Sequence, residues 1–586
     1  MQTLATILYQ NSLDRPQKQI LHLLRSGKED VHITYQALAG QAQRFVRAYS
    51  QAGLKPGEVV VLILQHGEEL IYAYWGAVLH GAIPSIMPFL TEKLQPERYR
   101  ADLASLVEIT QPAAIVTYAE FYDEVHSALE PGTSVRQVIV AEQIPDANES
   151  QPIDLQGLLR TGEDIVLLQH SSGTTGLQKG VALANQAVTN QLNSYRQALK
   201  LNAQDVVVSW LPLYHDMGLI AGFLMPILES VPLVLMSPFD WVRAPYRLMQ
   251  AVSHYRGTLT WLPNFAFNFC AQKTRDRHLE GVDLSSWRGV INCSEPVRWE
   301  SHQMFLERFQ PYGLQPQALG ACYAMAENVF AVTQTQIRSG STGADITVDE
   351  IDQEAFMRDR LALPVPLRPD TQASTTGRMK MLSNGAPIQG VEVRILGEDR
   401  QPLPERQVGE IALRSHCMLT AYYNRPDVTA QAFLDGWYLT GDYGYQASGE
   451  LYVTGRKKDL IIVGGKNVYP QDLEYLAMQI PGIHAGRVAA LGIYNQDLGT
   501  EEVVIVAEVD GLAEEKFDFS KKSNFSDSAE QQSIAQAVRD AITRNSAIAV
   551  RHVHLVAPGW LIKTSSGKVA RPANREKYLA EMNTQS

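Results

Sequence analysis

The sequence predicts an α/β protein with a large N-terminal domain and a smaller C-terminal domain. Short apolar runs such as 59–64 alternate with helically spaced segments such as 35–52, as in a mostly parallel sheet covered by helices. From Val391 onward, short strand-like runs separated by turn residues indicate a small β-rich subdomain within the N-terminal domain. After Gly455 a basic segment leads into a compact α+β pattern, which indicates the second domain.

The elements of the N-terminal domain follow from their hydrophobic patterns. Apolar runs predict buried strands at 59–64, 113–116, 138–140 and 206–210. Helical spacing predicts helices at 35–52 and 69–79. Residues 70–91 contain no Asp, Glu, Lys or Arg, but Pro84 and Pro88 interrupt them. Because two prolines would disrupt one spanning helix, we expect a buried helix and a short strand there, not a membrane span.

A domain boundary near Lys458 gives an N-terminal domain of residues 1–457 and a C-terminal domain of residues 458–586. The C-terminal domain shows strand-like and helical runs at 459–465, 469–480, 486–493, 501–509, 531–547 and 550–557. Residues 510–533 are polar and rich in serine, so we expect a surface loop or a mobile insert there.

Composition excludes several classes of protein. The 586 residues are 45% hydrophobic and 19% charged, which is ordinary for a globular chain. The net charge of −12 argues against general binding to nucleic acid or to an anionic membrane. The four cysteines form no CxxC pair, and no basic segment followed by an apolar core opens the chain. We therefore expect a cytoplasmic protein without a signal peptide or a disulfide framework.

A candidate phosphate-binding loop follows a predicted strand within 165–180, IVLLQHSSGTTGLQKG. Its small and hydroxyl-bearing residues let backbone N–H groups approach a phosphate, and a lysine adds a positive charge. The candidate ligands are Ser171, Ser172, Gly173, Thr174, Thr175, Gly176 and Lys179. The loop is not a Walker loop, because Gln178 stands where that motif requires glycine. A polar loop that merely caps a strand is the alternative.

The pattern Ser-Ser-Gly-Thr-Thr-Gly-x-x-Lys-Gly resembles the signature loop of the adenylate-forming superfamily, which includes acyl-CoA synthetases, adenylation domains and luciferases. Six further motifs follow in the family's order: WLPLYHDMG (210–218), NCSEP (292–296), CYAMAEN (322–328), WYLTGDYG (437–444), GRKKD (455–459) and KTSSGK (563–568). Gln178 replaces the usual proline and Ala324 replaces the usual glycine. The resemblance implies activation of a carboxylate by ATP and a C-terminal domain that rotates after adenylation.

The resemblance also implies roles for individual residues. Glu327 would bind Mg²⁺, because a carboxylate is a hard oxygen ligand, and Thr174 or Thr175 would touch metal or phosphate. Asp442 would accept hydrogen bonds from the ribose diol, and Arg456 would reach the same sugar. The nucleotide-binding set is completed by the residues that would enclose adenine: Ser294, Glu295, Pro296, Tyr323, Ala324 and Met325.

Two lysines and a histidine complete the implied machinery. Lys568, charged because its ordinary pKa is about 10.4, would stabilise the α-phosphate and carboxylate oxygens as the catalytic cation. Lys458 matches the hinge between the domains. His215 resembles a gating residue near the acyl carboxylate and is our third catalytic candidate. The alternatives are a solvated lysine for Lys568 and a neutral core histidine for His215.

Within the superfamily, the chain most resembles the fatty acyl-AMP ligases, which transfer the acyl group to the phosphopantetheine of an acyl carrier protein. The resemblance rests on WLPLYHDMGLI, LPNFAFNFC (262–270), YPQDLE (469–474) and the C-terminal VAPGWLIKTSSGK, and on the 55 residues between Glu327 and Ser383. That link, which includes the piece 345–369, is longer than is usual in acyl-CoA synthetases. An ordinary surface excursion is the alternative for this piece. An acyl-CoA synthetase that uses free CoA, or a non-catalytic ATP-binding scaffold, is the alternative for the protein.

Three phenylalanines suggest where the acyl group binds. Phe265, Phe267 and Phe269 alternate after Pro263, so aromatic rings on one face would wall an apolar tunnel; strand packing in the core is the alternative. We take Phe265 and Phe269 as the acyl-pocket candidates. The expected cofactors are ATP and Mg²⁺. The expected partners are a carboxylic acid and a carrier protein or CoA.

Overall fold

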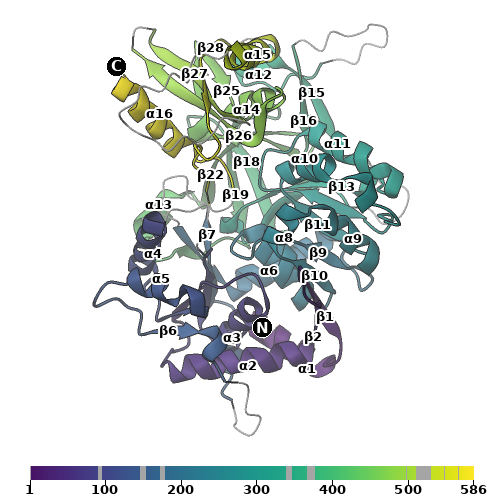
Figure 1. Ribbon diagram of the computed structural model, residues 1–586, viewed down its shortest axis with the longest axis vertical. Helices are drawn as coiled ribbons and strands as arrows, with labels where there is room; N and C mark the ends of the chain where they lie inside the picture. Colours follow the sequence, from purple (N-terminus) through teal and green to yellow (C-terminus); the bar gives the residue numbers. More distant parts are fainter. Residues whose placement is uncertain are drawn as a thin grey trace. The chain divides into compact units, whose positions relative to one another are not determined.

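The computed structural model describes residues 2–89, 96–145, 153–171, 179–337, 346–365, 377–496, 498–509, 529–546, 548–564 and 567–585 (Figure 1). The chain forms two compact units. Unit 1 contains Met1–Thr347, Ser383–Val393 and Leu413–Tyr438, and unit 2 contains Val348–Leu382, Arg394–Ala412 and Leu439–Ser586. These units do not coincide with the domains 1–457 and 458–586, which remain a prediction about the segment that moves.

Unit 1 contains two mostly parallel sheets, as its alternating pattern predicts. The nine-stranded sheet has, in spatial order, β17 (Ala386–Pro387), β14 (Ala331–Gln334), β13 (Leu319–Ala324), β12 (Gly289–Asn292), β11 (Leu259–Leu262), β9 (Val207–Ser209), β10 (Leu233–Met236), β1 (Gln19–Leu24) and β2 (Val31–Thr34). The seven-stranded sheet has β20 (Ala421–Tyr422), β8 (Lys179–Ala184), β7 (Ile165–Ser171), β4 (Ile83–Ile86), β3 (Val59–Leu62), β5 (Ala114–Thr117) and β6 (Gln137–Val140). All four predicted strands are therefore present.

Helices cover these sheets. They are α1 (Leu4–Asp14), α2 (Tyr35–Gln51), α3 (Glu68–His80), α4 (Pro96–Thr110), α5 (Tyr122–Ser127), α6 (Asn185–Leu199), π-helix η4 (Met217–Leu224), α7 (Met225–Leu228), α8 (Pro238–Arg243), α9 (Tyr246–Tyr255), α10 (Asn264–Lys273), α11 (Trp299–Phe309) and α13 (Pro426–Gln431).

Helix α3 is buried along its length from Leu70 to His80 and packs beside α2 (Figure 1). This close approach requires Gly76, since a Cβ there would lie 2.4 Å from Phe45 Cβ. The uncharged stretch 70–91 thus begins as a buried helix and continues into β4. In the part of the chain described above, none of the helices combines the length and hydropathy needed to cross a bilayer.

Unit 2 carries the α+β pattern predicted for the C-terminal segment. Its elements are β15 (Val348–Asp352), α12 (Gln353–Asp359), β16 (Arg378–Leu382), β23 (Glu450–Arg456), β24 (Ile461–Val463), β25 (Lys466–Val468), α14 (Pro470–Met478), β26 (Ile483–Asn495), β27 (Thr500–Val509), α15 (Ala529–Ser546), β28 (Val550–Val556) and α16 (Arg571–Gln585). The short strands expected from Val391 are β18 (Val391–Leu396), β19 (Gly409–Ser415), β22 (Trp437–Ala447) and β23. One expectation needs correction: the polar stretch 510–533 is not all loop. Its residues 529–533 begin helix α15, and 510–528 lie outside the described residues.

Three buried histidines make the stability of unit 1 depend on pH. Burial lowers the pKa of His66 and His170 to about 4 and that of His302 to about 3. His302 stacks on Phe267 with ring centroids 4.8 Å apart, and Asn292 Nδ2 lies 3.0 Å from its Nε2. Because the folded chain keeps these rings neutral while the unfolded chain binds protons below about pH 6.5, stability is complete above that pH. It is lost as the pH falls toward the folded-state pKa values.

We expect the urea midpoint of unit 1 to fall between pH 7 and pH 5, and His302→Leu to make this fall shallower. Each neutral buried histidine contributes about 1.4 kcal/mol per pH unit below about pH 6.5 to the slope of the unfolding free energy. The measurement is a set of urea unfolding curves for the wild type and the variant at several pH values. Since other titrating groups are common to both proteins, the difference in slope isolates His302. Parallel pH profiles would contradict the assignment.

Candidate active site

One edge of the nine-stranded sheet collects most of the predicted site residues of unit 1. Strands β9, β11, β12 and β13 are parallel neighbours, so their carboxyl ends meet at the same edge. The motifs that follow those ends are 210–218, 263–269, 292–296 and 322–328. Ligands of open α/β sheets bind outside the carboxyl ends of the strands. The edge is therefore the expected place for a substrate.

Glu327 is held by a tyrosine that the sequence motifs do not include. It lies in the single-turn helix η8 (Ala326–Asn328), where its Oε1 accepts a hydrogen bond of 2.9 Å from the Tyr422 hydroxyl. The Tyr422 and Tyr438 hydroxyls lie 2.9 Å apart. Burial, and then the charge of Glu327, raise the pKa of Tyr422 well above its usual range. The hydroxyl therefore stays protonated and orients the carboxylate.

The backbone after Glu327 is strained in a way that fixes this turn. Val329 has φ 62° and ψ −55°, and Phe330 N donates to Asn328 O at 2.6 Å, which is a γ-turn. A β-branched residue rarely adopts positive φ, and such strain persists where surrounding structure imposes it, commonly at functional sites. Leu419 N also donates to the Glu327 carbonyl at 2.7 Å.

The candidate phosphate loop is described only at its two ends. Ser171 ends β7 directly opposite Lys179, the first residue of β8. Lys179 Nζ lies 4.9 Å from the centroid of the Tyr422 ring. The predicted ligands between these ends lie outside the described residues: Ser172, Gly173, Thr174, Thr175 and Gly176. Lys179 and Glu327, opposite in charge and far apart in sequence, thus both contact Tyr422, one at its ring and the other at its hydroxyl.

The predicted adenine segments end β12 and β13. Ser294 has φ 69° and directs its Oγ toward Met217 Sδ at 3.8 Å. Glu295 Oε2 accepts a 3.0 Å hydrogen bond from Phe265 N, which ties this segment to α10, and Pro296 is exposed. Tyr323 is buried, with Ala324 and Met325 half-buried after it. Their role in binding adenine stays a prediction.

His215 lies near the same edge, just before helix η4. Its Nδ1 is 2.7 Å from Asp216 Oδ1, and Asp216 Oδ1 also caps η4 by accepting from Met217 N at 2.7 Å. The ring is half-buried, with 19% of the side chain exposed, so it is neither a surface residue nor fully enclosed core. Its position after β9 agrees with a role close to the acyl carboxylate.

The acyl-pocket candidates lie on a helix, which corrects the strand alternative. Residues 264–273 form α10, where side chains four apart share a face. Phe265 and Phe269 therefore share one face, and Phe267 lies on another, buried against His302 and Phe305. The alternation of three aromatic residues was a misleading signal, because a window this short does not separate a strand from a buried helix.

Unit 2 brings the two predicted ribose residues together. Asp442 in β22 and Arg456 in β23 are direct cross-strand partners, and Arg456 Nε lies 3.4 Å from Asp442 Oδ1. Asp442 is buried and Arg456 is exposed. A carboxylate with a guanidinium beside it provides both an acceptor and donors for a ribose diol.

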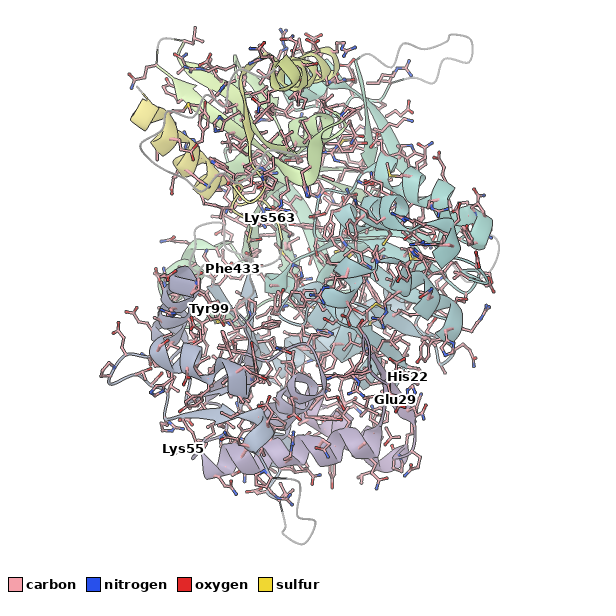
Figure 2. The ribbon with its side chains drawn as sticks, viewed as in Figure 1. His22, Glu29, Lys55, Tyr99, Phe433 and Lys563 are labelled. Atoms are coloured by element: carbon pink, nitrogen blue, oxygen red, sulfur yellow. The ribbon has the colours of Figure 1, made fainter. Side chains whose placement is uncertain are left out.

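Lys568 closes a small loop in unit 2. Lys563 and Val569 form an isolated bridge, Thr564 N donates to Lys568 O at 2.8 Å, and Lys568 N donates to Thr564 Oγ1 at 3.2 Å. Figure 2 labels Lys563, where this loop begins. Ser565 and Ser566 lie outside the described residues. Lys568 is half-buried and lies at the end of the short loop that these hydrogen bonds close.

A half-buried arginine two residues after this loop pairs with the segment of the predicted hinge. Arg571, the first residue of α16, lies 2.7 Å from both Asp459 and Glu474. Burial opposes its charge, but the two carboxylates outweigh burial and raise the pKa of Arg571. Asp459 belongs to the single-turn helix η9 (Lys457–Asp459), in which Lys458 is exposed. The hinge turn and the start of α16, two residues after the lysine loop, are therefore joined by one ion-pair network.

The donors present suit a metal only if the nucleotide supplies most of its ligands. Among the described residues, no three His, Cys, Asp or Glu side chains converge as a metal site. Glu327 offers one carboxylate, oriented by the Tyr422 hydroxyl. This fits Mg²⁺, which commonly binds one or two carboxylates together with substrate phosphates and water.

Known proteins resemble this chain over nearly its whole length. The family model described as AMP-binding enzyme matches residues 9–423. The chain is 29% identical, over 98% of its length and 95% of the relative's, to the medium-chain-fatty-acid–[acyl-carrier-protein] ligase JamA of Moorena producens. A structure from a study of fatty acyl-adenylate ligases of E. coli and L. pneumophila matches with TM-score 0.86 and 26% identity, covering 100% and 99% of the two chains. The L. pneumophila fatty acyl-adenylate ligase in complex with acyl adenylate and pyrophosphate matches with TM-score 0.72 and 28% identity. This match covers 99% of our chain and 96% of the ligase chain.

Proposed function

The chain belongs to the AMP-binding enzyme family, and on that premise we propose that it is a fatty acyl-AMP ligase. It activates a fatty or other apolar carboxylic acid with ATP and transfers the acyl group to the phosphopantetheine thiol of an acyl carrier protein. The observation that carries this proposal is that Glu327 and Lys179 both contact Tyr422, Glu327 at its hydroxyl and Lys179 over its ring, in the unit whose sheet edge carries His215 and the predicted adenine segments. JamA, the relative named above, supports the carrier protein as acceptor.

The reaction needs positioning and charge neutralisation more than covalent help. A carboxylate oxygen of the acid attacks the α-phosphorus of ATP, the bond to the β-phosphate oxygen breaks, and pyrophosphate leaves. Lys179 and Lys568 neutralise phosphate charge, Asp442 and Arg456 hold the ribose, and His215 lies by the acyl carboxylate. Glu327 would hold Mg²⁺, which would supply further positive charge beside the phosphates. In the second step the carrier thiol attacks the acyl carbon and AMP leaves.

The test is carboxylate-dependent ATP–pyrophosphate exchange across a panel of carboxylic acids, followed by acceptor assays. A ligase exchanges label only when a suitable acid is present, whereas an ATP-binding scaffold exchanges none with any acid. Carrier protein and free CoA are then compared as acceptors of pre-formed acyl-adenylate. Rapid formation of acyl-CoA would replace the carrier-protein proposal with that of an acyl-CoA synthetase.

The long link after Glu327 supports the choice of carrier protein over CoA. Its residues Ile351, Phe356 and Met357 are buried in a core of unit 2 that also contains Tyr443 and Tyr469. The described residues 346–365 of the link are therefore not an ordinary surface excursion. That core includes residues on both sides of Lys458, so a rotation at Lys458 must rearrange contacts made by the link. We propose that the link disfavours the rotated arrangement needed by free CoA, and that contacts with a carrier protein offset this bias.

Arg360 makes the clearest polar contact between the link and the chain after Lys458. Its Nε and Nη2 lie 3.2 and 3.1 Å from Asn467 Oδ1, while Asn467 Nδ2 donates to Met357 O at 3.0 Å. Arg358, two residues earlier in α12, is exposed and pairs with Glu354 of the same helix at 3.3 Å. These two arginines form a matched pair for substitution. Deleting the link is less informative, because its buried residues belong to the core.

We expect Arg360→Gln to raise CoA-dependent product formation about three- to tenfold without changing pyrophosphate exchange. Losing a contact worth about 1 kcal/mol raises the population of the rotated arrangement, relative to the described one, by about that factor. Arg358→Gln should leave both activities at wild-type levels. The measurement is acyl-CoA and acyl-carrier product at equal acyl-adenylate supply. An unchanged product ratio in Arg360→Gln would contradict the role of the link.

We also propose a cytoplasmic location. Its support is that all four cysteines are buried thiols without disulfides. Burial raises the pKa of Cys417 to about 12, so this thiol is unreactive.

A further inference from the structure

Four aromatic side chains form a cluster near the acyl candidates: Trp210, Trp241, Phe265 and Phe269. The indoles of Trp210 and Trp241 stack with centroids 3.5 Å apart and planes 2° from parallel. The Phe265 ring is edge-on to both indoles, with its centroid 6.4 Å from that of Trp210 and 6.1 Å from that of Trp241. Phe269 lies 5.4 Å from Trp241. The indoles are 4% and 0% exposed, whereas Phe265 is 41% exposed, so Phe265 forms the open side of this aromatic cluster.

The aromatic cluster occupies the end of the site edge away from the nucleotide candidates. Trp210 follows β9, Trp241 lies in α8 after β10, and the two phenylalanines lie in α10 after β11. The neighbouring strands β12 and β13 carry Ser294 and Tyr323. The hydrogen bond from Phe265 N to Glu295 joins the two regions directly. A substrate whose carboxylate faces the nucleotide segments would therefore extend its tail toward the indoles.

Two polar atoms in this apolar wall, the indole N–H groups of Trp210 and Trp241, are buried without a hydrogen-bond partner among the described residues. The Trp210 Nε1–H is buried and, in the described part of the chain, has no hydrogen-bond acceptor. The Trp241 N–H also makes no hydrogen bond of ordinary length, but it faces the Cys270 thiol and lowers the pKa of that thiol against the stronger raising effect of burial, whereas no thiol of the described residues interacts with the Trp210 N–H in this way. Buried indole N–H groups usually find an acceptor, and leaving one unpaired is costly. A ligand that supplied an acceptor at Trp210 would remove this cost.

We propose, building on the proposed ligase function, that the preferred acid carries an aromatic ring with an oxygen acceptor, and that Trp210 recognises that oxygen. Phe265 turns aside to admit the tail, since it alone of the four is largely exposed. The flat walls favour a ring over a flexible alkyl chain, because aromatic pairs gain from edge-to-face contact. Trp210 is thus a specificity-determining residue for the acid.

The experiment compares two isosteric series of acids in ATP–pyrophosphate exchange. One series consists of para-methoxyphenyl alkanoates and the other of para-ethylphenyl alkanoates, each with short, medium and long spacers. Straight-chain alkanoates serve as a third series. The variants are Trp210→Phe, which keeps a ring but removes the N–H, and Trp75→Phe as control. Trp75 is also fully buried with an unpartnered N–H, but packs in α3 against Phe223.

For at least one spacer we expect the wild type to prefer the methoxy acid over the ethyl acid about tenfold in kcat/KM, the scale of one satisfied buried donor. Trp210→Phe should bring the kcat/KM values of the methoxy and ethyl acids to equality, and Trp75→Phe should retain the preference. Equal use of both series by the wild type, or a preference that survives in Trp210→Phe, overturns the inference. Exchange with straight-chain acids alone overturns it too, but leaves the ligase function intact. No exchange with any acid refutes the ligase function itself.

Discussion

Replacing Lys568 by alanine should lower acyl-adenylate formation about 100- to 1,000-fold, the scale for losing one preorganised charge at a developing anion. The loop that carries Lys568 is closed by hydrogen bonds from the Lys568 and Thr564 backbones, which the substitution leaves in place. The loss should therefore reflect the missing ammonium and not an altered loop. Pyrophosphate exchange measures this step.

The second half-reaction separates the proposed states of the enzyme. With acyl-adenylate supplied, Lys568→Ala should transfer the acyl group at close to the wild-type rate, because we propose that the lysine loop has by then rotated away. Lys563→Ala is the matched control, since it removes an ammonium from the start of the same loop and should leave exchange near wild type. Equal loss of activity in both half-reactions would contradict the proposal that the enzyme uses one arrangement for adenylation and another for acyl transfer.

The second large effect concerns the hinge. Lys458→Pro should leave pyrophosphate exchange nearly intact and block acyl transfer, because proline fixes φ near −65° and removes the rotation that a hinge requires. Lys458 lies in the single-turn 3₁₀ helix η9, whose φ range is close to that value. The described conformation should therefore tolerate the ring at this position. Proline also restricts the backbone dihedral angles of the preceding residue, Lys457, and so could destabilise the fold. The Tm of the variant should therefore be measured alongside the assay.

Lys458→Ala distinguishes the backbone from the charge. It removes the ammonium but keeps both dihedral angles free, so we expect it to transfer the acyl group like the wild type. Transfer at the wild-type rate by Lys458→Pro would show that the chain does not pivot at this residue. Loss of transfer in both variants would assign the effect to the ammonium and not to the hinge.

Much of the site could be predicted because its residues lie in short contiguous motifs. The sequence predicts Glu327, Asp442, Lys458 and Lys568 as candidates without reference to distant parts of the chain. The structure shows Asp442 beside Arg456 on neighbouring strands. Tyr422 could not be predicted. It reaches Glu327 across 95 positions of sequence, and nothing in its local segment, LTAYYNRP, indicates that contact.

The sequence alone determined the alternation of strands and helices in unit 1 and the order of the motifs, because both depend on patterns within windows of a few residues. Tertiary structure decided the rest. It turned the alternating phenylalanines after Pro263 into a helix that packs its faces on different partners. It also buried Ile351 and Phe356 in a core shared with residues such as Tyr469. The physical reason is that burial and pairing depend on which distant surfaces exclude water together, and a local pattern does not contain that information.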